Sequence, residues 1–175
     1  MGITLVGVFA LSGIAACSVL RADVIRSTAD DTAAAVAQHA GWTRDVLSPD
    51  YLVVVNVLPG EEMFTTDQQT MTHPTGGELI IEGEGRPLGS HVRHVEAHIY
   101  RRDTGKVVTD IVPRITLTNR TTGEVIDVEA TLMQDVNIGQ LDRHFGNNVM
   151  VMPDSDIRVT VRLGDQEVSV DGHLD

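Results

Sequence analysis

The chain has 175 residues, a length that suits one domain, and a formal net charge of −12 from 13 basic and 25 acidic residues. Such an acidic chain is a poor partner for nucleic acid or for an anionic membrane surface, and its overall field attracts cations. Aromatic residues make up 3% of the sequence, which argues against a surface for stacking bases or sugars. We therefore expect no nucleic-acid partner.

Residues 1–16 are uncharged and rich in apolar and small residues, as in the hydrophobic part of a secretory signal, and are too few for a membrane-spanning helix. The segment Ile14 to Cys17 resembles a lipobox, in which the cysteine becomes the lipidated first residue. We predict a signal or lipoprotein leader at 1–16, a lipid anchor to the membrane at Cys17, and an extracytoplasmic location, either membrane-anchored or as a periplasmic or secreted protein. The alternative is a cleaved or retained apolar end with a buried free cysteine. As Cys17 is the only cysteine, it has no partner for a disulfide within the chain.

Residues 17–47 are expected to form a short tether, either helical or disordered. A possible cap at Thr28–Asp31 precedes apolar residues at helical spacing, and Gly41 would end such a helix.

From Tyr51 onward the apolar pattern has a period of two, which is typical of strands separated by turns. Residues 48–175 are predicted to form one all-β domain, an immunoglobulin-like antiparallel β-sandwich, with a barrel as the structural alternative. We expect a loop at 61–77 and a single strand at 124–132. The other expected strands span 51–58, 78–82, 91–100, 115–119, 149–152, 156–163 and 166–170.

The segment from His91 to Tyr100 has an unusual composition for a strand. Side chains alternate between the two faces of a sheet, so three ionisable residues share one face and three apolar residues share the other: His94, Glu96 and His98 against Val95, Ala97 and Ile99. His91 falls outside this phase. Buried imidazoles and carboxylates need partners or a cation, so this face is a candidate metal site.

Two further residues have suitable chemistry and follow in the chain. Met133 lies at the end of one expected strand, directly after residue 132, and His144 lies in the loop after it. Imidazole suits copper, zinc, iron and nickel; a thioether favours copper, and a carboxylate favours harder ions. The alternatives are solvated histidines and a methionine in the core. Nucleophile and phosphate-binding motifs are absent from the sequence, so we expect no enzyme.

The order of these motifs resembles bacterial periplasmic iron-transport proteins that bind copper, the ferrous-iron transport protein family. HVEAHIY, DIVPRITLTNRTTGE, TLMQDV and RHFGNNVMVM follow the family's order between about Val92 and Val161. The resemblance implies an immunoglobulin-like fold, often a homodimer, and a metal held by methionine and histidine beside a glutamate. It implies the ligand set His94, Glu96, Met133 and His144, with His98 and His173 as weaker candidates.

The expected function is extracytoplasmic binding of a metal ion, copper with iron as a further possibility, in metal uptake or handling, with a membrane permease as a possible partner. The alternative is an envelope interaction or structural module of the same fold without a metal site. A copper oxidase or superoxide-dismutating enzyme ranks third.

Overall fold

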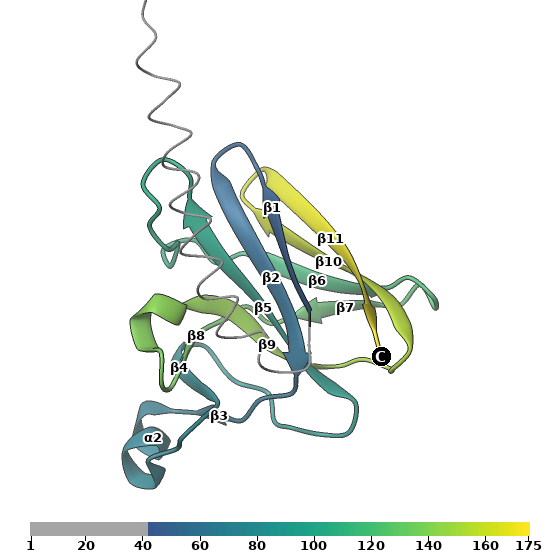
Figure 1. The fold of residues 1–175 in the computed structure, drawn as a ribbon. Coiled ribbons are helices and arrows are strands. Elements are labelled where there is room, and N and C mark those ends of the chain that lie inside the picture. Colours follow the sequence, from purple (N-terminus) through teal and green to yellow (C-terminus); the bar gives the residue numbers. More distant parts are fainter. Residues whose placement is uncertain (1–41) are drawn as a thin grey trace, which may run out of the picture.

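The computed structural model describes residues 42–175, which form two β-sheets and two short helices (Figure 1). The strands in chain order are β1 (Trp42–Leu47), β2 (Tyr51–Pro59), β3 (Met63–Phe64), β4 (Glu78–Glu82), β5 (Val92–Arg101), β6 (Arg114–Asn119), β7 (Val125–Val128), β8 (Thr131–Asp135), β9 (His144–Met150), β10 (Ser155–Leu163) and β11 (Gln166–Leu174). The helices are α2 (Thr66–Thr72) and the 3-10 helix η1 (Gly139–Asp142). The predicted leader (1–16), Cys17 and residues 17–41 of the predicted tether lie outside the described residues.

The two sheets form an open sandwich. The larger sheet has seven strands in the order β1-β2-β5-β9-β8-β4-β3, and the smaller has four in the order β11-β10-β6-β7. Neighbouring strands are antiparallel except for the short parallel pair β3 and β4. The predicted all-β sandwich is therefore confirmed.

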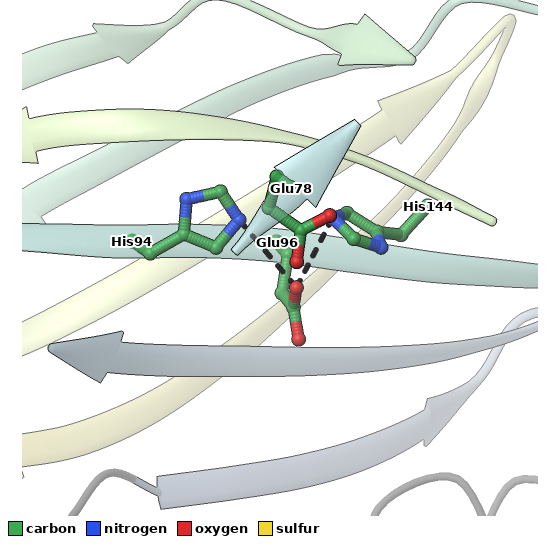
Figure 2. Close-up of side chains that lie close together, drawn as sticks. All are labelled: Glu78, His94, Glu96 and His144. Atoms are coloured by element: carbon green, nitrogen blue, oxygen red, sulfur yellow. Dashed lines mark ion pairs between the residues drawn. The ribbon is translucent and has the colours of Figure 1, made fainter. Parts of the chain in front are cut away.

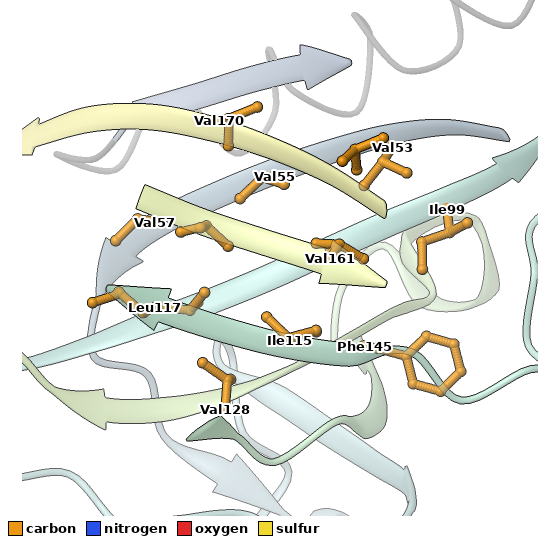
Figure 3. Packing of buried hydrophobic residues seen from close by; sticks show 14 of the residues in the cluster. Val53, Val55, Val57, Ile99, Ile115, Leu117, Val128, Phe145, Val161 and Val170 are labelled. Atoms are coloured by element: carbon orange, nitrogen blue, oxygen red, sulfur yellow. The ribbon is translucent and has the colours of Figure 1, made fainter. Parts of the chain in front are cut away.

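The core lies between the facing sides of the two sheets (Figure 3). The buried apolar residues at odd-numbered positions of β2, β5 and β9 face the smaller sheet, because successive side chains of a strand alternate between faces. The apolar side chains that fill this layer include Val53, Val55, Val57, Ile99, Ile115, Leu117, Phe145, Val161 and Val170. At one edge, the Trp42 ring of β1 lies directly over Gly172 of β11, where no Cβ would fit, and so joins the two sheets.

Three sequence predictions about elements need correction. Residues 42–47, expected as the end of the tether, form β1 and pair with β2 along their whole length. Residues 61–77, expected as a loop, contain β3 and α2. Helix α2 starts at a capping box, in which Thr65 and Gln68 each bond the other's backbone N–H.

The predicted strand 124–132 is also divided in two. Residues 125–128 form β7 in the smaller sheet, whereas 131–135 form β8 in the larger sheet. The chain crosses between sheets at Glu129 and Ala130.

No helix in residues 42–175 has the length and apolar composition needed to cross a membrane.

The opposite side of the larger sheet is buried as well. Strands β2 and β5 bury nearly every residue, so their even-numbered side chains are also shielded from water. On β5 these side chains are His94, Glu96 and His98, whose exposed fractions are 0%, 2% and 1%. The larger sheet therefore has an apolar inner face and a buried outer face that holds ionisable groups.

Candidate metal centre

Four ionisable side chains from three strands meet on this outer face (Figure 2). Strand β5 supplies His94 and Glu96, β9 supplies His144, and β4 supplies Glu78. Each offers one ligand atom, and these atoms lie within 4.8 Å of one another. We refer to these four residues as the metal cluster.

The distances within the metal cluster suit a small cation. Oε2 of Glu96 lies 3.5 Å from Nε2 of His94 and 3.2 Å from Nε2 of His144, which lies 3.6 Å from Oε2 of Glu78. A tetrahedral centre with bonds of about 2.0–2.1 Å separates its ligand atoms by roughly 3.3–3.4 Å. These three distances are therefore close to those of such a centre, and all four ligand atoms lie within 4.8 Å of one another.

Hydrogen bonding fixes which nitrogen of His144 faces the cluster. Nδ1 of His144 lies 2.7 Å from the backbone carbonyl of Asp142, and a carbonyl can only accept, so Nδ1 carries the proton. In the neutral ring, Nε2 then presents a lone pair. This nitrogen is buried and has no hydrogen-bond partner among the described residues.

His94 is oriented in the same way by Asn148. The amide nitrogen of Asn148 donates to the carbonyls of Glu61 and Arg86, and its oxygen accepts from the Glu61 N–H, so the amide orientation is defined. That oxygen also lies 3.3 Å from Nδ1 of His94, which therefore donates. The free nitrogen is again Nε2, which is buried and without a hydrogen-bond partner in the described part of the chain. Metal-bound histidines are commonly held through their other nitrogen in this manner.

Glu96 is held through one oxygen, which directs the other at the histidines. Oε1 accepts a 2.6 Å hydrogen bond from Asn56 and lies 3.3 Å from Nε2 of His98. Oε2 is the oxygen nearest to His94 and His144. His98, a weaker candidate ligand from the sequence, contacts Oε1 of Glu96, and its ring centroid lies 4.9 Å from that of His144. With Asp142 and His144 it forms a second group of possible ligand atoms within 4.8 Å of one another.

Gly146 allows β9 to approach β5 at this point. It pairs with Glu96, and a Cβ on Gly146 would overlap the Val95 carbonyl oxygen and come within 2.9 Å of the Glu96 Cα. A side chain here would push the two strands apart. The glycine in the HFGNN segment therefore sets the distance between His144 and Glu96.

The electrostatics of the cluster favour positive charge. Burial raises the pKa of Glu78, and the neighbouring Glu96 raises it further, against the opposing effect of His144. Burial also acts to raise the pKa of Glu96, but His144 and His98 lower it well below its usual value. Burial acts to lower the pKa of His144, yet Glu96 and Glu78 hold it well above the ordinary value. Two buried carboxylates compete here for positive charge that a proton or a metal ion can supply.

Met133 also belongs to this face. It is fully buried and pairs directly with His144 across β8 and β9, so both side chains lie on the same side of the sheet. Its neighbour Leu132 points into the apolar core instead. The strand register thus places the thioether beside the metal cluster.

His173 lies elsewhere. It is half exposed on β11 of the smaller sheet, where Nδ1 lies 3.0 Å from Asp156. Its other nitrogen lies near Asp154 and Asp175. The structure therefore brings together His94, Glu96, His98 and His144, with Met133 beside them, and leaves His173 in a separate surface group.

Sequence reasoning did not identify Glu78. This residue opens an apolar segment, ELIIE, and was expected only as the first residue of a strand. It is 3% exposed and its Oε2 atom has no hydrogen-bond partner among the described residues. Its place beside His144 depends on the pairing of β4 with β8 and of β8 with β9, which is not visible in the sequence. The sequence held one signal for Glu78, which is that an acidic residue stands at the start of a strand whose next residues are apolar and buried.

The fold and cluster together define a β-sandwich with a buried imidazole–carboxylate site. No family model and no curated protein matches the sequence. Among solved structures, FetP of uropathogenic Escherichia coli, as isolated, has a TM-score of 0.49 at 17% identity, covering 75% of this chain and 93% of that chain. A copper-bound variant of the same FetP has the same TM-score and identity and covers 77% and 93%. These values describe a distant likeness in fold.

Proposed function

We propose that this protein binds a divalent transition-metal ion at the metal cluster, with copper as the preferred ion. The observation that carries the proposal is the convergence beside Glu96 of three buried ligand atoms that have ion-pair contacts of 3.2–3.6 Å but no hydrogen bond: Nε2 of His94, Nε2 of His144 and Oε2 of Glu78. Leaving a buried polar atom without a hydrogen bond costs roughly 1–3 kcal/mol. Three such atoms around one carboxylate oxygen are accounted for by a cation that binds all of them.

The donor set supports copper before other ions. Imidazole nitrogen binds copper well, and among divalent first-row metals copper(II) forms the most stable complexes in most nitrogen and oxygen sites. Met133, beside His144, adds a soft donor that favours copper further. The two carboxylates admit zinc or ferrous iron as competitors.

The proposed role is binding rather than catalysis, in uptake or handling of the metal outside the cytoplasm. The apolar segment at 1–16 and Cys17 support the extracytoplasmic part of this proposal. Lipidation of Cys17, a membrane permease and a homodimer stay predictions.

Titration calorimetry of the metal-stripped protein tests the function. We expect one Cu²⁺ per chain with a dissociation constant well below about 10 μM. Zn²⁺ and Fe²⁺, titrated separately, rank the competitors. The double variant His94→Ala/His144→Ala should lose this binding.

A matched control removes two exposed histidines. His73 and His91 both have positive φ, which asparagine tolerates, so His73→Asn/His91→Asn is the suitable variant. It should bind copper as the unmutated protein does. Absence of binding tighter than about 10 μM in the unmutated protein would overturn the proposal and favour the interaction or structural module without a metal site.

A further inference from the structure

A cavity of about 750 Å³ opens beside the metal cluster. Its floor includes Glu78, Glu96 and Asp142, which are nearly inaccessible to solvent, and its rim includes the exposed residues Glu62 and Asn137. A water molecule occupies about 30 Å³ of liquid, so roughly 25 would fill this space. The cavity therefore has room for an ion with its hydration shell beside the cluster.

The cavity is acidic from rim to floor. Its described lining includes six carboxylates and no lysine or arginine; the carboxylates are Glu61, Glu62, Glu78, Glu96, Asp135 and Asp142. At the floor, Oε2 of Glu78 and Oδ1 of Asp142 are buried and have no hydrogen-bond partner in the described part of the chain. Buried carboxylate oxygens without hydrogen bonds at the end of an acidic passage, one of them 3.6 Å from Nε2 of His144, point to a cation.

The walls of the cavity are held by hydrogen bonds between its segments. The Glu78 N–H donates to the Glu62 carbonyl at 2.8 Å, and the Val136 N–H donates to the Gly77 carbonyl at 3.0 Å. The side chain of Asn137 also donates to the Thr75 carbonyl at 3.1 Å. The passage is thus part of the folded structure, bounded by the segments around 60–62, 74–78 and 135–142.

We propose that this cavity is the route by which a free, hydrated divalent cation reaches the metal cluster, and that Glu61 and Glu62 at its mouth speed its capture. This inference rests on the proposed function. A cleft lined by charges of one sign raises the local concentration of the opposite ion and accelerates association by about ten- to a thousandfold. A cation that has lost part of its water then meets the buried oxygens of Glu78 and Glu96.

Stopped-flow mixing of metal-stripped protein with Cu²⁺, followed by ligand-field absorption, measures capture directly. The variant Glu61→Gln/Glu62→Gln should slow association about three- to tenfold at low ionic strength. The stoichiometry and the final spectrum should not change, because the residues of the cluster are intact. The difference from the unmutated protein should shrink in high salt.

The matched control removes two acidic residues far from the cavity. Glu124 precedes β7 and Asp165 lies in the turn between β10 and β11, and both are exposed. Glu124→Gln/Asp165→Asn changes the net charge by the same amount, so its association rate should stay within about twofold of the unmutated value. Equal slowing in the two double variants would overturn the proposed role of the mouth.

A second variant tests the route by obstruction. Gly76 lines the cavity, and a Cβ built there meets no atom within 4 Å, so Gly76→Phe can add a ring without a clash at its first atom. It should slow association and chelator-induced dissociation by similar factors and leave the dissociation constant unchanged, whereas Gly76→Ser should behave normally. Unchanged rates with Gly76→Phe would overturn the route and favour delivery to another surface. If the unmutated protein binds no Cu²⁺, the proposed function itself has failed.

Discussion

At the metal cluster the two faces of the larger sheet are both buried and differ in chemistry. Phe145 and His144 are neighbours on β9, with exposed fractions of 2% and 1%, yet one points into the apolar core and the other into the metal cluster. The inner face removes apolar surface from water, which stabilises the fold. Beside the metal cluster the outer face buries imidazoles and carboxylates, several with atoms that make ion-pair contacts but no hydrogen bond, and burying such atoms carries a desolvation cost that a bound cation would offset.

The contrast separates residues that maintain the fold from residues that give it a function. Substitutions on the inner face should change the free energy of unfolding and leave metal affinity in the folded protein intact. Substitutions of the metal cluster on the outer face should weaken metal binding and have a smaller effect on the free energy of unfolding. Pairs of adjacent residues on one strand are the most direct way to test this division.

The largest expected effect comes from Phe145→Ala. Removing a fully buried ring leaves a cavity and lowers the free energy of unfolding by about 3–5 kcal/mol. Urea denaturation of the metal-stripped protein measures the loss. The folded fraction should still bind Cu²⁺ with close to normal affinity, and a large drop in affinity without a stability change would reverse the roles of the two faces.

His144→Ala tests the opposite side of the same strand. Loss of a metal ligand should weaken Cu²⁺ binding by at least about 100-fold, because even indirect partners of a metal site contribute 10- to 100-fold. Calorimetry measures the affinity, and urea denaturation should show a smaller stability change than for Phe145→Ala. Full affinity in His144→Ala would remove this residue from the site.

Asn56→Ala and His98→Ala test the support of Glu96. Each removes one contact to Oε1 and leaves the proposed ligand atoms in place. We expect affinity to fall about tenfold, with a shifted ligand-field spectrum as the carboxylate reorients. If His98→Ala alone abolishes binding, His98 is itself a ligand.

A smaller effect concerns the pH dependence of stability without metal. The pKa of His144 is raised well above its ordinary value of 6.5, so the stability that its charge contributes is fully present below that pH and is lost as pH rises through the pKa of the folded state. Glu78, also raised from 4.5, acts in the same direction, whereas the lowered pKa of Glu96 contributes stability that is lost in acid. Thermal unfolding in a chelator should therefore show declining stability from neutral to alkaline pH.

The bound metal should oppose this decline. Ligands bind metal in their deprotonated forms, so the stabilisation by Cu²⁺ should increase as pH rises over the same range. The matched comparison is His144→Ala without metal, whose stability should change less between neutral and alkaline pH. An equally steep decline in that variant would assign the effect to other groups.

The sequence predicted the strands whose apolar pattern reflects burial. The continuous apolar segment in β2 and the alternation in β10 arise directly from two-sided and one-sided burial. The division between β7 and β8 was missed because apolar residues keep alternating through 126–132 while the chain changes sheets. Helix α2 buries none of its residues, so it has no apolar period, although its capping box was present in the sequence.

The sequence predicted those site residues that lie together on one strand. It did not predict several of the residues that reach the site through hydrogen-bonded pairing between strands. The alternation in β5 correctly placed His94 and Glu96 on the face opposite Val95. Glu78 was not predicted, since it reaches the cluster through two successive strand pairings. Asn148 and Asn56 were missed for the same reason, because hydrogen bonds between distant strands define their roles.

Anomalous diffraction from Cu²⁺-loaded crystals at the copper edge tests the central claim most directly. We predict one peak on the outer face of the larger sheet, at about 2.0–2.2 Å from Nε2 of His94 and Nε2 of His144 and in contact with Glu96. A fully occupied peak at another place, such as His173 and Asp156 on the smaller sheet, with none at the metal cluster, would contradict it.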